Sequence, residues 1–241
     1  QVIILSLLLI KNYYLLGSKN KLKRFIENES FFNVIQPSRE ELISNQFKLK
    51  GNWNNLFFKN NNPIVVELGC GKGEYTINLA KRNPSVNYIG VDIKGARFWR
   101  GAKTANEENL DNVVFLRTQI ELINYVFKKG EVSEIWLTFP DPQIKFQRRK
   151  HRLTNPSFLE LYKKILNPKG IVHLKTDSEF LHGYTLGLLE GLSITPLKSN
   201  HDVYKNFNAP EEVTNIKTHY EKMFSELNKN ISYLSFNFND E

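Results

Sequence analysis

The sequence has only one cysteine and one methionine among its 241 residues. Because Cys70 stands alone, no internal disulfide can form, which fits a protein of a reducing compartment. The largely apolar stretch at 2–10 is too short to span a bilayer and has no basic segment before it. The one methionine, Met223, lies far from the start of the chain. We therefore expect residues 1–16 to lie outside the mature fold, with a degenerate signal peptide as the alternative.

Acidic residues are fewer than basic ones: 25 Asp and Glu stand against 33 Lys and Arg, a formal net charge of +8. A strongly basic balance favours a polyanionic partner. A generally solvated basic surface explains the charge equally well. The hydrophobic content of 41% is ordinary for a soluble globular protein, and the length suits one α/β domain.

Apolar runs and helical patterns alternate from residue 64 onward. This alternation predicts a parallel sheet covered by helices on both faces. The segment 231–238 alternates apolar and polar residues, which predicts an antiparallel edge strand. We expect a basic N-terminal arm and lead-in at 17–62 and the main domain at 63–241. The predicted strands are 64–68, 87–92, 113–117, 133–139 and 170–176, and the predicted helices are 74–82, 96–109, 120–128, 156–166 and 179–190.

A glycine-rich loop follows the first predicted core strand. Residues 67–73 read Glu-Leu-Gly-Cys-Gly-Lys-Gly, and Asp92 ends the next apolar run, where a carboxylate can hold ribose hydroxyls. The glycine spacing differs from that of dinucleotide folds, and Glu67 would repel a pyrophosphate. The same acid suits the cationic amino-acid end of S-adenosylmethionine. The loop therefore indicates a methyltransferase rather than a dehydrogenase, with a tight turn that binds no ligand as the alternative.

The fourth predicted strand runs directly into Pro140-Asp141-Pro142. Ligands of open α/β sheets bind beyond the carboxyl ends of the strands, so we expect Asp141 beside the cofactor. The alternative is a turn in which Asp141 bonds only its own backbone.

A basic run follows at 145–152, with five permanent positive charges in eight residues. No helical apolar stripe crosses it, which predicts a loop. At the rim of an active site, such a run would meet the phosphates of a nucleic acid. In another location it would be a solvated face.

Five segments occur in the order found in one known family: 67–73, 139–142, the basic run, Leu-Lys-Thr-Asp at 174–177 and Thr-His-Tyr-Glu at 218–221. Together they resemble the bacterial tRNA (guanine-N7-)-methyltransferase family. The resemblance implies a Rossmann-like class I methyltransferase fold with a mostly parallel, seven-stranded sheet. It also implies methyl transfer from S-adenosylmethionine to N7 of a guanine in tRNA, at variable-loop position 46.

The resemblance also assigns roles to residues of this chain. Asp141 is the implied catalytic residue. Two positions depart from the common family pattern: Gln143 stands where many members have Trp, and Gln119 where many have Asp. The implied cofactor-binding residues are Glu67, Gly69, Gly71, Gly73, Asp92, Gln119 and Asp141. The implied substrate-binding residues are Lys145, Gln147, Arg148, Arg149, Lys150, His151, Arg152, Asp177, Thr218, His219, Tyr220 and Glu221.

The implied chemistry needs no strong base, because guanine N7 already presents a lone pair. Asp141 could stabilise the cationic product ring or hold the donor edge of the guanine, and the sequence leaves both roles open. The alternatives are a methyltransferase of another RNA or a small molecule, and a non-catalytic RNA-binding subunit. The histidines show no metal-ligand spacing, so no metal is expected. We expect tRNA as partner, no membrane, a monomer or homodimer, and a cytoplasmic location.

Overall fold

The computed structural model describes residues 20–206, 209–218, 221, 223 and 229–238. These residues form one eight-stranded sheet in the order β1-β4-β3-β2-β5-β6-β8-β7. Strands β1 to β6 are parallel to one another, whereas β8 is antiparallel to both β6 and β7. The strands are β1 (Val34–Ile35), β2 (Ile64–Leu68), β3 (Asn87–Val91), β4 (Val113–Leu116), β5 (Val132–Thr138), β6 (Leu166–Thr176), β7 (Lys198–Asn200) and β8 (Ser232–Asn237).

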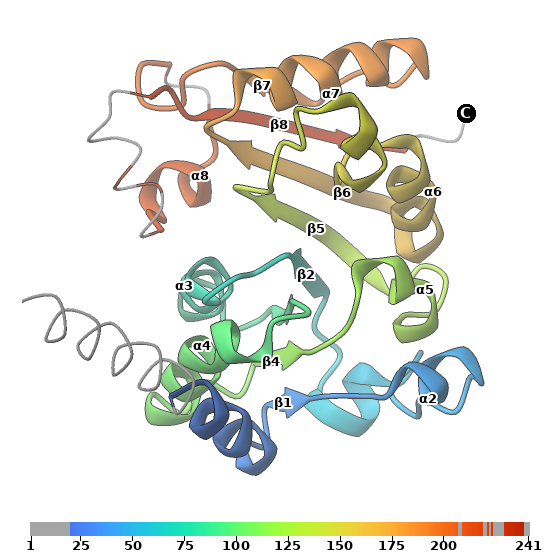
Figure 1. Cartoon of the computed structure of the whole chain (residues 1–241), viewed down its shortest axis with the longest axis vertical. Helices are drawn as coiled ribbons and strands as arrows, with labels where there is room; N and C mark the ends of the chain where they lie inside the picture. Colours follow the sequence, from blue (N-terminus) through green and yellow to red (C-terminus); the bar gives the residue numbers. More distant parts are fainter. Residues whose placement is uncertain (1–19, 207–208, 219–220, 222, 224–228, 239–241) are drawn as a thin grey trace, which may run out of the picture.

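Helices cover both faces of the sheet, and Figure 1 shows α3, α4 and α8 on its left and α2, α5 and α6 on its right. The faces follow from the alternation of side chains along each strand: Val66 and Leu68 of β2 join one buried cluster, and Val65 joins the other. The α-helices are α2 (Arg39–Ile43), α3 (Glu74–Arg82), α4 (Gly95–Glu107), α5 (Ile123–Val126), α6 (Pro156–Ile165), α7 (Glu179–Gly191) and α8 (Glu211–Asn215). The other helical segments are a helix at 20–30, a π-helix, η1 (Trp53–Phe58), and two 3-10 helices, η2 (Ile120–Leu122) and η3 (Phe146–His151).

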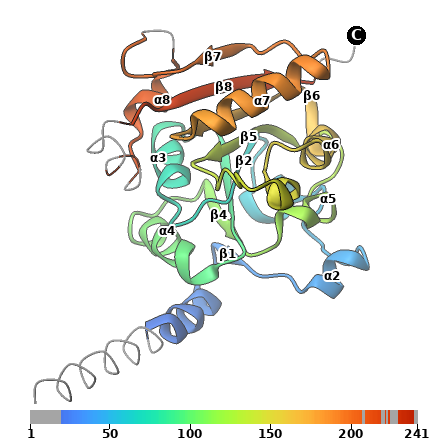
Figure 2. The same ribbon diagram turned by 45° about the horizontal axis from the view of Figure 1, so that its top comes forward.

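The predicted fold class is confirmed, and the predicted strands and the helices at 74–82 and 156–166 agree with the structure to within a few residues. Helix α6 begins where expected because Asn155 caps it, its side chain accepting a bond from the Phe158 amide. The sheet has eight strands rather than the seven that the resemblance implies, and the very short β1 and β7 are the two for which the sequence pattern gave no range. Figure 2 shows that β7 lies outside β8, so the antiparallel C-terminal strand is one position in from the edge.

The segment expected as a lead-in contributes to the main core. Strand β1 extends the sheet beside β4, and Trp53 is fully buried in the same cluster as the strands. The expected helix at 120–128 is divided into η2 and α5, and the run expected as a loop contains η3. No helix in the described part of the chain is long and apolar enough to cross a membrane. Residues 1–16 lie outside the described residues.

Candidate functional site

A cavity of about 790 Å³ lies at the carboxyl ends of the parallel strands. Five adjacent strands are each followed by a residue that lines it: β4 by Thr118, β3 by Asp92, β2 by Gly69, β5 by Asp141 and β6 by Asp177. Its size is within the ordinary range for small-molecule sites, about 300–1,000 Å³. This is the position at which open α/β sheets bind their ligands.

Two glycines of the loop after β2 border the cavity in left-handed conformations, Gly69 with φ 79° and Gly71 with φ 57°. The amide of Gly69 donates to the carbonyl of Val91 at 2.8 Å, which ties the loop to β3. A Cβ built on Gly71 would meet no atom within 4 Å, so it would point into open space. The glycine therefore leaves room for a ligand to approach the backbone.

Gly73, the third glycine of the loop, has surroundings that differ from those of Gly69 and Gly71. It does not line the cavity, and a Cβ at this position would lie 2.4 Å from Cε1 of Phe115. Its φ of 76° also belongs to the left-handed region. Close packing of the start of α3 against β4 therefore requires a glycine here, and the expected cofactor contact of Gly73 stays a prediction.

Glu67, near the end of β2, is almost completely buried yet lines the cavity. Its Oε2 accepts bonds from the amide (2.9 Å) and the hydroxyl of Thr76, and its Oε1 accepts one from the hydroxyl of Thr138. Burial raises the pKa of Glu67 to about 7 against the opposing effect of these bonds, and the charge of Asp92 adds to the rise. A cationic ligand in the cavity would favour its ionised form.

Asp92 is held rigidly by the backbone on both sides. Its Oδ2 accepts a bond from the Gly71 amide at 3.0 Å, and its Oδ1 accepts one from the Lys94 amide at 2.7 Å. Gln119 also lines the cavity, and its Oε1 accepts a bond from Arg39 at 3.0 Å. Both side chains are therefore oriented before any ligand binds.

Asp141 is exposed at the cavity, in a turn of unusual backbone conformation. Phe139 and Gln143, which flank the Pro-Asp-Pro segment, both have a φ of 48°, a region that non-glycine residues rarely adopt. The Oδ1 of Asp141 accepts a bond from the Gln143 amide at 3.1 Å. Asp141 thus bonds its own turn and also borders the cavity. Strained turns of this kind are concentrated at functional sites.

The basic run after this turn divides into an exposed part and a buried end. Lys145, Gln147, Arg148, Arg149 and Lys150 are exposed, and His151 lines the cavity. Arg152 is only 6% exposed, and its guanidinium donates to backbone carbonyls. It therefore faces inward, which contradicts the expectation that it lies on a phosphate-contacting surface.

The structure describes three of the remaining expected substrate residues, and their environments differ from one another. Asp177 and Thr218 line the cavity, and Asp177 forms an ion pair with Lys229 at 3.1 Å. Glu221 is fully buried and pairs with Lys175 at 2.7 Å, so it lies behind the cavity rather than on its surface. His219 and Tyr220 lie outside the described residues.

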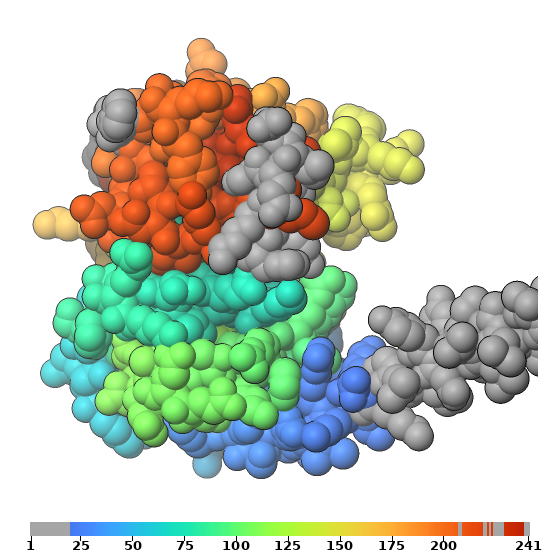
Figure 3. All heavy atoms as spheres, turned by 90° about the vertical axis from the view of Figure 1, so that its left-hand side faces the viewer, coloured from blue at the N-terminus to red at the C-terminus, as the bar shows by residue number. Residues whose placement is uncertain are grey.

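The segment that carries Thr218 is held against the body of the domain through α8. The hydroxyl of Tyr75 in α3 donates to the carbonyl of Glu212 at 2.9 Å. Figure 3 shows the orange-red segment around α8 lying directly above α3 in cyan. Helix α3 is thereby in contact with both sides of the site, the glycine loop and the C-terminal segment.

Sequence reasoning missed several residues of the site, of which Tyr75, Thr138 and Lys175 matter most. Tyr75 and Thr138 line the cavity, and Lys175 is fully buried, with its ammonium 5.4 Å from the ring centre of Tyr75. A lysine directly after Leu174, near the end of a predicted core strand, is the signal that could have revealed Lys175. Across the described ranges, no group of three or more His, Cys, Asp or Glu side chains could hold a metal ion.

Comparison with known proteins gives matches along most of the chain. A family described as "Putative methyltransferase" matches residues 61–234. The tRNA (guanine-N(7)-)-methyltransferase of Christiangramia forsetii is 66% identical over 221 residues, which cover 92% of this chain and 99% of that protein. The enzyme of the same name from Porphyromonas gingivalis is 50% identical over 190 residues, covering 79% of this chain and 77% of that protein.

Solved structures share the fold at low sequence identity. A 30S ribosomal A1408 methyltransferase from an uncultured bacterium matches with a TM-score of 0.54 and 18% identity, covering 74% of this chain and 89% of that one. A SAM dependent methyltransferase from Aquifex aeolicus matches with a TM-score of 0.50 and 17% identity, covering 83% of this chain and 92% of that one. At such identities the likeness concerns the fold alone.

Proposed function

The chain belongs to the tRNA (guanine-N(7)-)-methyltransferase family, and from this premise we propose that it transfers a methyl group from S-adenosylmethionine to N7 of a guanine in tRNA. The products are 7-methylguanosine and S-adenosylhomocysteine. We propose position 46 of the variable loop as the acceptor and the cytoplasm as the location. One observation carries the proposal: the carboxylates of Glu67, Asp92 and Asp141 border one cavity, and a basic segment begins at its rim.

The residues of the cavity fit S-adenosylmethionine. The open space at Gly71 admits a ligand against the loop, and Asp92, already oriented by two amides, can accept bonds from ribose hydroxyls. The amide oxygen of Gln119 can accept a bond from the adenine amino group. The ionised form of Glu67 suits the positively charged amino-acid end. When bound, the cofactor supplies a methyl group on a sulfonium, which needs no metal.

The chemical step requires alignment more than proton transfer. Guanine N7 carries a free lone pair, so the protein has to hold that atom in line with the methyl group. Methylation leaves a positive charge on the guanine ring. Asp141, placed at the cavity by a constrained turn, can offset this charge or accept bonds from the guanine donor edge. Asp177 and Thr218, which also line the cavity, are the proposed contacts to the acceptor nucleotide.

The exposed cations of the run after Asp141 are proposed to bind the RNA backbone. Lys145, Arg148, Arg149 and Lys150 present their charges to solvent beside the cavity. Phosphate contacts of this kind set the position of an RNA without reading its sequence. Gln147 and His151 are proposed to contact the same strand, because His151 also borders the cavity.

The proposal is tested by methyl transfer from labelled S-adenosylmethionine to three acceptors: an unmodified tRNA transcript, a ribosomal RNA fragment and free guanosine. We expect label in the tRNA alone, recovered as 7-methylguanosine after digestion. Label only in the ribosomal fragment would favour a methyltransferase of another RNA, and label only in guanosine would favour a methyltransferase of a small molecule. Binding of tRNA without any transfer would favour a non-catalytic subunit.

A further inference from the structure

Arg152 ends the basic segment but does not share its exposure. Its side chain is 6% exposed, whereas those of Arg148, Arg149 and Lys150 face solvent. No carboxylate is paired with it among the ion pairs of the described residues. A buried guanidinium needs other partners, and here those partners are carbonyl oxygens and aromatic rings.

Both carbonyl partners of Arg152 belong to the turn that carries Asp141. Its Nε and Nη2 each donate to the carbonyl oxygen of Gln143 at 3.2 Å. Nη2 also donates to the carbonyl of Ile144 at 3.4 Å. Two nitrogen atoms thus converge on one carbonyl, a fork geometry that a lysine ammonium cannot reproduce.

The opposite surface of the guanidinium packs against α7. Its central carbon lies 4.4 Å from the ring centre of Tyr184 and 4.8 Å from that of Phe180. The backbone of Arg152 is fixed as well, since its carbonyl accepts a bond from the amide of Asn155, the cap of α6. Arg152 therefore connects the turn to α7 through its side chain and to the start of α6 through its backbone.

The contact reaches Asp141 in one further step. The amide of Gln143, whose carbonyl Arg152 holds, donates to Oδ1 of Asp141 at 3.1 Å. Gln143 has a φ of 48°, and a non-glycine residue keeps this conformation only when its surroundings impose it. Arg152 supplies that constraint at the carbonyl of Gln143, and the amide of the same residue orients the carboxylate of Asp141.

Resting on the proposed function, we propose that Arg152 is a positioning residue for methyl transfer. It fixes Gln143 in the left-handed conformation, so that the Gln143 amide orients the Asp141 carboxylate at the cavity. It does not contact RNA phosphate. Two arginines of one run thus have separate tasks, Arg148 in binding and Arg152 in the chemical step.

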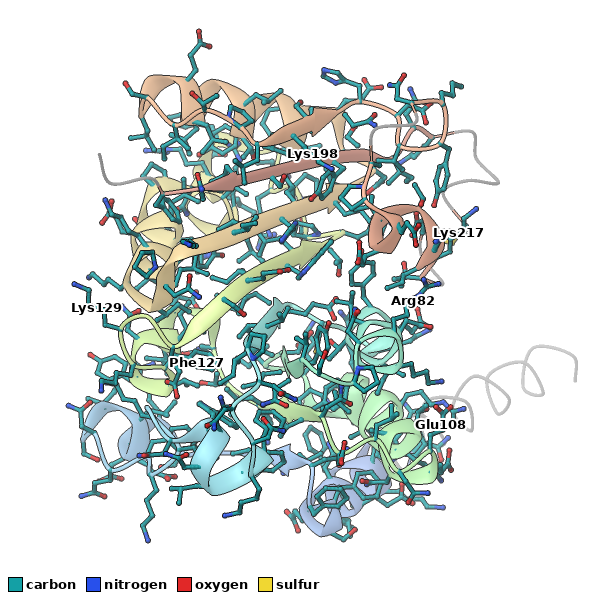
Figure 4. All side chains as sticks on the ribbon, turned by 180° about the vertical axis from the view of Figure 1, so that it is seen from behind. Arg82, Glu108, Phe127, Lys129, Lys198 and Lys217 are labelled. Carbon is teal, nitrogen blue, oxygen red and sulfur yellow. The ribbon has the colours of Figure 1, made fainter. Side chains whose placement is uncertain are left out.

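The test compares Arg152→Lys with Arg148→Gln and with Lys129→Gln. Arg152→Lys retains the charge and removes the fork, and it disturbs packing less than a shorter side chain would. Lys129 is an exposed residue at the turn between α5 and β5, at the amino end of that strand (Figure 4), and serves as the remote control. Single-turnover methylation at saturating tRNA, tRNA affinity and cofactor affinity are measured for each variant.

We expect Arg152→Lys to lower the single-turnover rate by about a hundredfold, the loss that accompanies a displacement of about 1 Å at a reacting centre. Its affinity for tRNA should be unchanged, because the exposed cations of the run supply the proposed phosphate contacts. Arg148→Gln should instead weaken tRNA binding, and Lys129→Gln should alter neither quantity. If Arg152→Lys weakens tRNA binding and keeps its rate, or changes nothing, the proposal is overturned.

Amide hydrogen exchange of residues 139–145 gives a readout that does not depend on turnover. Arg152→Lys should speed exchange in this turn relative to the wild type and Arg148→Gln. Unaltered exchange would overturn the positioning role. If the wild type does not methylate tRNA but this exchange difference is found, the proposed function is wrong. The conclusion that Arg152 holds the turn in place would still be supported.

Discussion

The Nζ of Lys175 lies 2.7 Å from Oε2 of Glu221, and neither side chain is exposed to solvent. Lys175 also donates to the carbonyl of Ile216 at 2.9 Å, and the hydroxyl of Tyr204 donates to the other oxygen of Glu221. The Glu221 amide donates to the hydroxyl oxygen of Thr218, which lines the cavity. This buried pair therefore anchors the segment that carries Thr218 to strand β6.

Removing one member of this pair should strongly destabilise the protein. Lys175→Met leaves the charge of Glu221 buried without its partner, and losses of about 3–5 kcal/mol in the free energy of unfolding are typical of such changes. Replacing both residues, Lys175→Met with Glu221→Leu, should recover much of the loss. Urea unfolding of Lys175→Met, Glu221→Leu and the double variant measures this. A Glu221→Leu variant of normal stability that no longer binds tRNA would instead identify Glu221 as a substrate contact.

The raised pKa of Glu67 predicts a pH dependence of both stability and cofactor binding. Because this pKa is about 7 in the folded chain and 4.5 in the reference state, the folded form holds the proton more tightly between these values. The stability of the ligand-free protein should therefore fall as pH rises from about 4.5 to about 7. Affinity for S-adenosylmethionine should rise over the same window as the carboxylate forms.

The matched variant for this prediction is Glu67→Gln, which cannot ionise. Thermal unfolding and calorimetric titration across pH should both become flatter in this variant than in the wild type. Identical pH profiles for the two proteins would show that Glu67 does not titrate as described.

Gly71 and Gly73 of the glycine loop should respond differently to the same substitution by alanine. Gly73→Ala places a methyl group against Phe115 and should destabilise the fold, with overpacking costs of about 1–3 kcal/mol. Gly71→Ala meets no protein atom within 4 Å, so beyond the cost of its left-handed φ of 57° it should chiefly weaken cofactor binding by filling ligand space. Thermal unfolding and cofactor calorimetry on both variants separate the effects. The reverse pattern would contradict the assignment of Gly71 to the cofactor site.

The exposed cations should contribute through phosphate contacts alone. Arg148→Gln, Arg149→Gln and Lys150→Gln together should flatten the salt dependence of tRNA binding by about 0.7 per lost contact on single-stranded RNA. Cofactor affinity should be unchanged, because these side chains do not line the cavity. Filter binding across a salt series measures the slope. If the triple variant kept the wild-type salt slope, these three residues would not contact RNA phosphates.

The sequence was most informative where local pattern and tertiary structure coincide. The buried run of β2, the glycines after it and the capped start of α6 could be read directly from local residues. Strands β1 and β7 could not be predicted, because two or three residues show no alternation. Their pairing depends on neighbours far away in the chain.

Within the site, residue type was predictable and residue environment was not. Gly71 and Gly73 share one spacing, yet the ring of Phe115, from a distant strand, makes only Gly73 a packing residue. Arg148 and Arg152 likewise share one basic run, and the rings of α7 determine which of them turns inward. These distinctions come from long-range packing, which a charge or glycine pattern does not contain.

The central claim is that the methyl group is transferred to N7 of a guanine in tRNA. It is tested most directly by single-turnover methylation of two tRNA transcripts, one with guanosine and one with 7-deazaguanosine at the acceptor position. The second transcript keeps the base-pairing edge of guanine and lacks the N7 lone pair. We predict labelled 7-methylguanosine from the first transcript and no transfer to the second, although both bind. Equal transfer to the two transcripts would contradict the account.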